Sequence, residues 1–173
     1  AFEFSKAFLV YVKKVVALTS MNKILVMGSG SWGTALVKIL LENSEMQVDW
    51  WVRSPETAEH INSKGRNPKY LRSVKFDTSR LKAGSNVQQL VAANDTILLV
   101  TPSAFVSDVL DQLTNEQLAG KRIISAIKGV EPNTLKIVGE YLFENKGVAV
   151  SDFGVITGPC HAEEVAQEKL SYL

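Results

Sequence analysis

Three glycines within a stretch of six residues constrain the fold of this chain more than any other feature. Gly28, Gly30 and Gly33 form the pattern G-x-G-x-x-G, which follows a short apolar run and precedes apolar residues at helical spacing. Between a strand and a helix, these glycines allow a tight turn, the approach of a pyrophosphate and close helix–strand packing. The free N–H groups of the helix N-terminus would add a positive dipole end. This context favours a dinucleotide site over a glycine turn without a ligand.

Short apolar runs and helical patterns alternate along the rest of the chain. The expected strands are residues 23–27, 48–53, 96–100 and 122–126, with short strands at 148–150 and 155–157 on either side of Gly154. The expected helices are residues 32–41, 56–63, 87–93, 105–113 and 134–143. The polar stretch 64–86 is expected to be a loop with at most one short strand, at 74–76. The alternation predicts an α/β fold with a doubly wound, mainly parallel, Rossmann-type sheet and helices on both of its faces.

Length and composition narrow the classes of protein to which the chain can belong. Its 173 residues fit one domain of roughly 100–200 residues. The 19 Lys and Arg against 18 Asp and Glu are scattered, so nucleic acid is not an expected partner. No stretch approaches the roughly 18 consecutive apolar residues of a membrane helix. The one cysteine, Cys160, cannot form an internal disulfide, which favours a cytoplasmic protein.

The end of the second expected strand bears on the choice of dinucleotide. NAD-binding folds usually carry an acidic residue about 20 residues after the glycine loop, and this chain has Arg53 followed by Ser54 and Pro55 there. Ser54 and Pro55 are typical of a helix start, and a guanidinium beside that start suits a 2′-phosphate. We expect that NADPH is preferred or that NADP and NAD are both used; the alternative is a solvated arginine at a strand end.

Four motifs in a fixed order complete the pattern. The glycine loop continues to Leu36, and it is followed by Asn-Pro-Lys-Tyr-Leu at 67–71, Lys-Gly-Val-Glu at 128–131 and Gly-Pro-Cys-His-Ala-Glu-Glu at 158–164. Together they resemble the NAD(P)-dependent glycerol-3-phosphate dehydrogenases of the bacterial type. The resemblance implies reversible hydride transfer between NAD(P)H and dihydroxyacetone phosphate, which gives sn-glycerol 3-phosphate for phospholipid synthesis. It also implies a possible homodimer of the full-length enzyme.

The resemblance assigns roles to individual residues. Contacts with the dinucleotide would come from Ser31, Trp32, Arg53, Phe105, Lys128 and Ala162, with Phe105 beside the nicotinamide half. Lys128 would also touch the substrate, together with Gly158 and Cys160. Family members more often carry serine at the position of Cys160, and a thiol is the weaker hydrogen-bond donor.

Lys128 also stands out without the resemblance. It follows the expected strand 122–126, and ligands of doubly wound sheets bind outside the carboxyl ends of the strands. A cation at that place can polarise a ketone oxygen and stabilise the alkoxide that forms on hydride delivery. The alternative is a surface lysine before a glycine turn. No metal site is expected, because His60 has no Cys or His four residues away.

The two ends of the chain carry separate expectations. Residues 1–20 precede Met21, which we expect to be the natural start, and they form an extension without an assigned function. Residues 21–173 are expected to be an NAD(P)-binding domain that is truncated at its C-terminal end, with the family's C-terminal helical domain and second catalytic lysine absent. Such a fragment should bind cofactor and turn over poorly or not at all. The competing hypotheses are a non-catalytic dinucleotide-binding module and a related two-domain reductase of another ketone.

Overall fold

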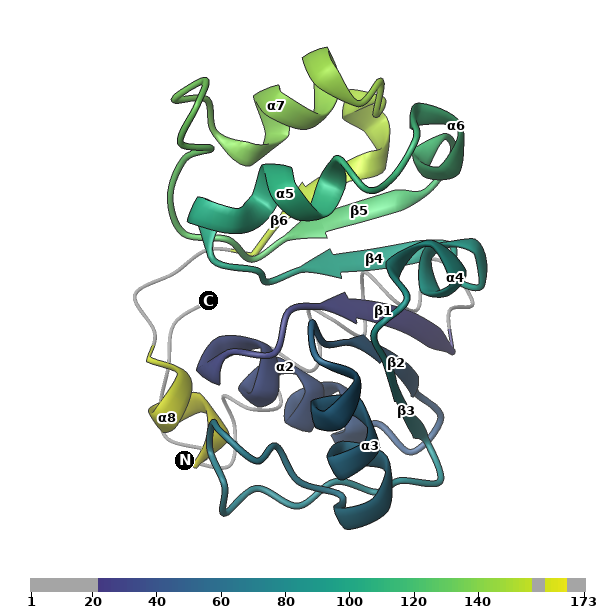
Figure 1. Ribbon diagram of the computed structural model, residues 1–173, viewed down its shortest axis with the longest axis vertical. Coiled ribbons are helices and arrows are strands. Elements are labelled where there is room, and N and C mark those ends of the chain that lie inside the picture. Colours follow the sequence, from purple (N-terminus) through teal and green to yellow (C-terminus); the bar gives the residue numbers. More distant parts are fainter. Residues whose placement is uncertain (1–21, 157–160, 168–173) are drawn as a thin grey trace.

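The computed structural model describes residues 22–156 and 161–167 (Figure 1). Six parallel strands form one sheet in the order β3-β2-β1-β4-β5-β6. The strands are β1 (Lys23–Met27), β2 (Gln47–Trp51), β3 (Leu81–Gly84), β4 (Thr96–Leu99), β5 (Arg122–Ser125) and β6 (Phe153–Val155). The predicted α/β fold with a doubly wound parallel sheet is therefore confirmed. The expectation for residues 1–20 lies outside the described residues.

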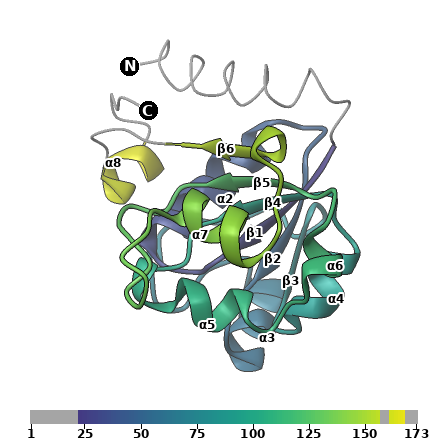
Figure 2. The same cartoon turned by 90° about the horizontal axis from the view of Figure 1, so that it is seen from above.

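Helices cover both faces of the sheet. They are α2 (Ser31–Glu42), α3 (Pro55–Lys64), α4 (Val87–Ala92), α5 (Val106–Leu110), α6 (Asn115–Leu118), α7 (Val138–Asn145) and α8 (Ala162–Ala166), with 3-10 turns η1 (Ser103–Phe105) and η2 (Val150–Asp152). One apolar core joins the sheet to α2, α3 and α8, and the other joins it to α4, α5, α6 and α7. On the first face α8 packs beside α2 (Figures 1 and 2). None of the helices in the described part is long and apolar enough to cross a membrane.

The strand β1 shows why these residues form a central strand. Its alternate side chains enter opposite cores, with Ile24 and Val26 in one and Leu25 and Met27 in the other. A parallel strand covered on both faces needs an almost continuous apolar run, and β1 supplies one. It pairs with β2 on one side and with β4 on the other. The strand order therefore reverses next to the carboxyl end of β1, where doubly wound sheets bind ligands.

The stretch 64–86 differs from the prediction. It contains the edge strand β3, whereas residues 74–76 form no strand, although Val74 and Phe76 are buried. β3 is short and begins on the inward-facing Leu81. The side chain of Asn62 occupies the hydrogen-bonding groups at its outer edge. Asn62 Nδ2 donates to the Ala83 oxygen at 2.9 Å, and Ala83 N donates to Asn62 Oδ1 at 2.8 Å. A strand completed by an amide side chain leaves little periodic pattern in the sequence.

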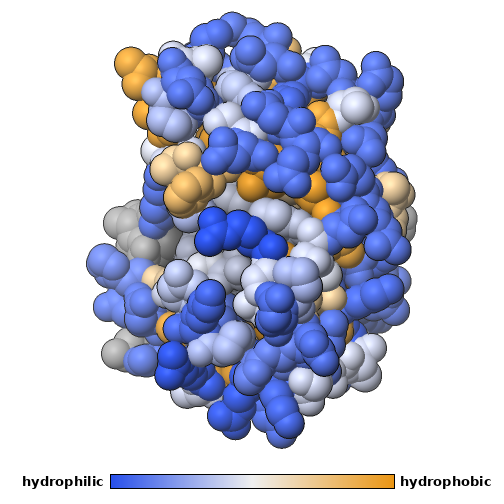
Figure 3. All heavy atoms as spheres, viewed as in Figure 1, coloured by the Kyte–Doolittle hydropathy of each residue, from blue (hydrophilic) through white to orange (hydrophobic). Residues whose placement is uncertain are grey.

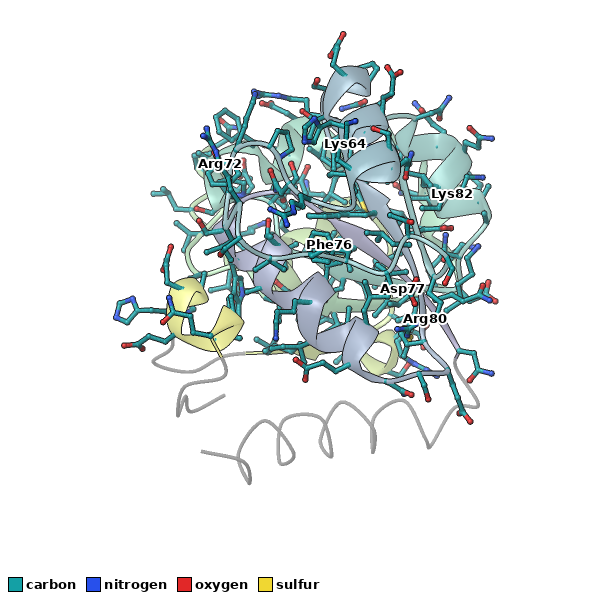
Figure 4. The ribbon with its side chains drawn as sticks, turned by 90° about the horizontal axis from the view of Figure 1, so that it is seen from below. Lys64, Arg72, Phe76, Asp77, Arg80 and Lys82 are labelled. Carbon is teal, nitrogen blue, oxygen red and sulfur yellow. The ribbon has the colours of Figure 1, made fainter. Side chains whose placement is uncertain are left out.

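Arg80 ties the same stretch to the end of α2. Its guanidinium donates to the carbonyl oxygens of Leu41 at 2.9 Å and Asn43 at 2.7 Å, which are acceptors at the helix C-terminus, and it pairs with Asp77 at 2.9 Å. Seen from the β3 edge, Asp77 and Arg80 lie together, well away from Arg72 (Figure 4). This arrangement orients the segment that leads into β3.

The second half of the chain also departs from prediction in its boundaries. The helix expected at 134–143 begins at Val138, because Leu135 adopts the left-handed conformation with φ 57° and cannot be helical. The helix expected at 105–113 is shorter, because α5 spans only Val106–Leu110, directly after the 3-10 turn η1. The helix α6, whose start Thr114 caps, was not predicted. Residues 148–150 form no strand, and Gly154 lies within β6 instead of between two strands.

Candidate functional site

A cavity of about 370 Å³ lies at the carboxyl ends of the strands, beside the point where the strand order reverses. Its walls come from the glycine loop, from the residues after β4 and β5, and from the start of α8. The lining residues of the predicted site are Gly30, Ser31, Trp32, Lys128 and Ala162. The structure therefore brings together five of the residues singled out from the sequence.

The other predicted residues lie elsewhere or outside the described part. Arg53 is exposed after β2, and Phe105 is 48% exposed at the end of η1; neither lines the cavity. Ser103, two residues before Phe105, does line it. Gly158 and Cys160 lie outside the described residues. His60 is exposed on α3.

The three glycines have different surroundings. Gly28 has φ 130°, and a Cβ there would lie 2.7 Å from the Val100 carbonyl. A Cβ on Gly33 would overlap the carbonyl oxygen of Gly28. A Cβ on Gly30 would meet no atom of residues 22–156 and 161–167 within 4 Å. Contacts within the protein thus require Gly28 and Gly33, whereas Gly30 borders open space that a ligand can occupy.

Two buried side chains hold the glycine loop from outside. Trp50, in β2, donates its Nε1 hydrogen to the Gly28 oxygen at 2.8 Å. Asn67, only 1% exposed, donates from Nδ2 to the Ser29 oxygen at 3.0 Å and to Thr34 Oγ1 at 2.8 Å. Asn67 lies in one of the sequence motifs, but no function was predicted for it. Its hydrogen-bond partners lie more than thirty residues away in the sequence, so the proline that follows it in a polar loop was the only sign of its importance.

Asn67 also places a second segment beside the loop. Its Oδ1 accepts hydrogen bonds from the backbone N–H groups of Lys69 at 2.9 Å and Tyr70 at 3.2 Å. The fragment Asn67–Tyr70 is therefore folded around one amide side chain that also contacts the glycine loop.

The residues after β2 carry a charge pattern that was not predicted from the sequence. Ser54 caps α3 by accepting from Thr57 N at 3.2 Å, as predicted, and its hydroxyl donates to Glu56 Oε2 at 2.5 Å. This hydrogen bond, with a smaller contribution from the charge of Lys69, lowers the pKa of the Glu56 carboxyl. An acidic group is thus present three residues after Arg53, although it comes from the first turn of the helix and not from the strand.

Lys128 and the glycine loop both line the cavity. Its Nζ is 5.5 Å from the centroid of the Trp32 ring, within the range of a cation–π contact. The Nε1 hydrogen of Trp32 is buried and finds no acceptor in the described part of the chain. Hydrophobic atoms gather on the half of the molecule above this region, over α5 and the segment between β5 and α7 (Figure 3). There Val130, Leu135 and Ile137 are exposed.

These features fit a dinucleotide. The helix α2 begins without a side-chain cap and without an acidic residue in its first turn, so that its N–H groups are left for an anion such as a pyrophosphate. Gly30 leaves space at this point, and Trp32 offers a buried donor that has no acceptor among the residues described by the structure. Among residues 22–156 and 161–167, no group of three or more His, Cys, Asp and Glu side chains could hold a metal ion.

Known proteins resemble this chain in sequence and in fold. The glycerol-3-phosphate dehydrogenase (NAD(P)+) of Oceanobacillus iheyensis is 38% identical over 146 residues, which are 84% of this chain and 42% of that protein. The crystal structure of glycerol-3-phosphate dehydrogenase from Coxiella burnetii has a TM-score of 0.74 at 28% identity, over 84% of this chain and 43% of that one. For the enzyme of Saccharomyces cerevisiae the TM-score is 0.74 at 30% identity, over 84% and 44%. The chain thus spans less than half the length of these relatives.

The family match covers the whole chain after the first twenty-two residues. It includes the glycine loop, Lys128 and the start of α8, which are the parts that meet at the cavity. Residues 23–173 match the model described as NAD-dependent glycerol-3-phosphate dehydrogenase N-terminus, and the chain belongs to this family.

Proposed function

We propose that this chain is the dinucleotide-binding part of an oxidoreductase that transfers hydride reversibly between NAD(P)H and dihydroxyacetone phosphate, giving sn-glycerol 3-phosphate. One observation carries the proposal: a single cavity joins the glycine loop to Lys128 at the point where the strand order reverses. The family match and the names of the relatives support it.

The described residues perform two tasks in this reaction. The N–H groups at the start of α2 bind the pyrophosphate, and the space beside Gly30 lets it approach the backbone. When bound, the nicotinamide supplies or accepts the hydride. The ammonium group of Lys128 donates a hydrogen bond to the ketone oxygen of the substrate and stabilises the negative charge that develops there. Trp32 keeps that ammonium group against the cavity wall.

The surroundings of Arg53 support the use of both dinucleotides. Arg53 and Lys69 are cations that favour the 2′-phosphate of NADPH. Glu56 repels that phosphate and can accept hydrogen bonds from the ribose hydroxyls of NADH. The opposing charges therefore favour a modest preference for NADPH over a strict one.

We assign the remaining catalytic groups to the part of the longer relatives that this chain does not span; the chain covers 42% of the length of the relative from Oceanobacillus iheyensis. In this proposal a second lysine in that part moves the proton, and the complete enzyme is a cytoplasmic protein and a possible homodimer. Gly158 and Cys160 hold the glycerol phosphate. The 173-residue chain by itself binds the cofactor and turns over slowly or not at all.

Titration of the chain with NADH and with NADPH tests the cofactor half of the proposal. Tryptophan fluorescence should change to saturation with both, because Trp32 lines the cavity. The variant Trp32→Phe should lose most of that signal while calorimetry still detects binding. A folded chain that binds neither dinucleotide would contradict the proposal.

The substrate half is tested on the chain saturated with NADH. Dihydroxyacetone phosphate should produce a further saturable change, whereas dihydroxyacetone, which lacks the phosphate, should not. The change should disappear in Lys128→Met. Equal responses to several unrelated ketones would favour a reductase of another substrate, and no response to any would favour a non-catalytic module.

A further inference from the structure

Glu131 is a buried carboxylate to which the proposed chemistry gives no task. Its side chain is 0% exposed. Burying a carboxylate is unfavourable unless hydrogen bonds replace the lost water. Both oxygens accept from Asn133 N at 3.1 Å, and Oε2 also accepts from Thr134 N and from Thr134 Oγ1 at 2.7 Å each. A carboxylate with so many donors is held in one position.

The backbone around Glu131 is closed into a tight turn. Glu131 N donates to the Lys136 oxygen and Leu135 N donates to the Glu131 oxygen, both at 2.8 Å. Val130 and Ile137 form an antiparallel bridge across the turn. Leu135 is held at φ 57°, which is unfavourable for leucine, and its side chain is 74% exposed, so its own packing does not hold it there. The carboxylate of Glu131, which lies inside the turn, can hold Leu135 in this conformation through its hydrogen bonds to Asn133 and Thr134.

The turn is fastened to the neighbouring helix on the side of the cavity. Ser107, which is buried on α5, lies close enough to Glu131 that its hydroxyl helps to lower the pKa of this carboxyl. Gly129 approaches the same segment so closely that a Cβ there would lie 2.8 Å from Ser103 Oγ. Both residues that flank Val130 are therefore held against η1 and α5.

Lys128 directly precedes Gly129 and lies three residues before Glu131. On its other side, Ala126 N donates to the Leu99 oxygen at 2.8 Å and Ile127 N donates to Ser125 Oγ at 3.3 Å. The backbone of Lys128 is thus anchored by the sheet before it and by the Glu131 turn after it. Its exposed side chain still keeps Nζ 5.5 Å from the centre of the Trp32 ring.

We propose that Glu131 is a positioning residue that holds Lys128 at the cavity wall by clamping the turn of residues 129–137. It touches neither cofactor nor substrate, and it acts only through the backbone next to Lys128. The consequence for hydride transfer rests on the proposed function. The clamp itself does not, because it is a property of the chain without a ligand.

The test compares Glu131→Gln with Glu140→Gln in the 173-residue chain. Glutamine keeps the size of the side chain but turns an NH₂ group toward the donors of Asn133 and Thr134. Glu140 is a matched control, since it is an exposed carboxylate that accepts one hydrogen bond, from Ile137 N at 3.3 Å. The readout is the indole N–H signal of Trp32 in a ¹H–¹⁵N spectrum without cofactor, assigned with Trp32→Phe and calibrated with Lys128→Met.

In Glu131→Gln the Trp32 signal should move at least half of the way to its position in Lys128→Met, while the signals of Trp50 and Trp51 stay in place. Glu140→Gln should leave all three unchanged. A folded Glu131→Gln variant with the parent Trp32 signal would overturn the proposal. If Glu131→Gln does not fold, Thr134→Val removes one donor from the same carboxylate and should shift the signal in the same direction; no shift there would overturn it.

Dinucleotide binding separates this inference from the proposed function. If the parent chain binds neither NADH nor NADPH but Glu131→Gln shifts the Trp32 signal, the clamp stands and the proposed function fails. If the parent binds both and Glu131→Gln leaves the Trp32 signal unchanged, the function stands and the clamp fails.

Discussion

The glycine loop and the loop that carries Lys128 border the same cavity, but they are held in place by different means. The glycine loop requires glycine at positions 28 and 33, where there is no room for a Cβ. It is also held by the neutral amide of Asn67. The loop of Lys128 depends on one buried charge, the carboxylate of Glu131. The glycine loop should therefore be disrupted by substitutions that add atoms. The loop of Lys128 should be disrupted by a substitution that neutralises the charge of Glu131.

The largest effect is expected from adding one methyl group to the glycine loop. Gly33→Ala places a carbon against the carbonyl oxygen of Gly28, which is backbone and cannot move aside. We expect a loss of about 3 kcal/mol in the free energy of unfolding, at the upper end of overpacking, measured by urea denaturation. A variant as stable as the parent would show that the loop is less constrained than the geometry indicates.

Asn67→Ala should have the next largest effect. It removes the donor to Ser29 and Thr34 and the acceptor for Lys69 and Tyr70. Unsatisfied buried groups cost roughly 1–3 kcal/mol, so we expect a loss of about 2 kcal/mol together with weaker binding of both dinucleotides.

Asn62→Ala is the matched control for Asn67→Ala. It removes two comparable hydrogen bonds at the β3 edge, away from the cavity. It should lower the stability and leave the dinucleotide affinities unchanged. Equal weakening of binding in both variants would mean that Asn67 acts only through global stability.

The two loops should differ in their response to acid. Burial alone would raise the pKa of the Glu131 carboxyl, but hydrogen bonds from Thr134, Asn133 and Ser107 outweigh it and lower the pKa from 4.5 to about 2. A lowered pKa in the folded state contributes stability that is fully present above pH 4.5 and is lost as the pH falls toward 2. Denaturation of the parent and of Glu131→Gln should therefore show a difference that shrinks across this range.

The penalty of Asn67→Ala provides the comparison, because an amide does not titrate between pH 4.5 and 2. Its size should stay constant over the window in which the Glu131→Gln penalty declines. A Glu131→Gln penalty that is independent of pH would contradict the assigned role of the charge.

The smallest effects concern the choice between the two dinucleotides. Arg53→Ala should weaken NADPH binding by about fivefold, or about 1 kcal/mol, since Arg53 is exposed and its charge is screened. NADH binding should change little. Glu56→Gln should act in the opposite direction and strengthen NADPH binding. Calorimetric dissociation constants that keep the parent ratio in both variants would remove these residues from the selection of cofactor.

The sequence predicted those parts of the molecule that depend on local patterns. The glycine loop, β1 and Lys128 after β5 were located correctly, because each lies in or directly after a short apolar run. The tasks of Asn67 and Glu131 were not predicted, since they depend on which backbone groups the fold brings near. The part proposed for Glu56 was not predicted either, because an acidic residue was sought at the end of the strand, whereas Glu56 lies in the first turn of the next helix.

The structural misassignments have similar causes. The start of α7 was predicted too early because the pattern of residues 134–143 is helical, whereas Thr134 donates to Glu131 and Leu135 turns left-handed around it. The strand β3 was missed because an edge strand that ends on a glycine and is completed by Asn62 carries little periodicity of its own. Tertiary contacts decided both regions.

The central claim is that the space beside Gly30 is the dinucleotide site, and Gly30→Ala tests it most directly. A Cβ there meets nothing within 4 Å among the described residues, and Gly30 has φ −71°, which alanine adopts readily, so the melting temperature should not fall. The dissociation constants of NADH and NADPH, measured by calorimetry, should both rise by about tenfold or more, which is at least ~1.4 kcal/mol. A stable Gly30→Ala variant that binds both as tightly as the parent would contradict the account.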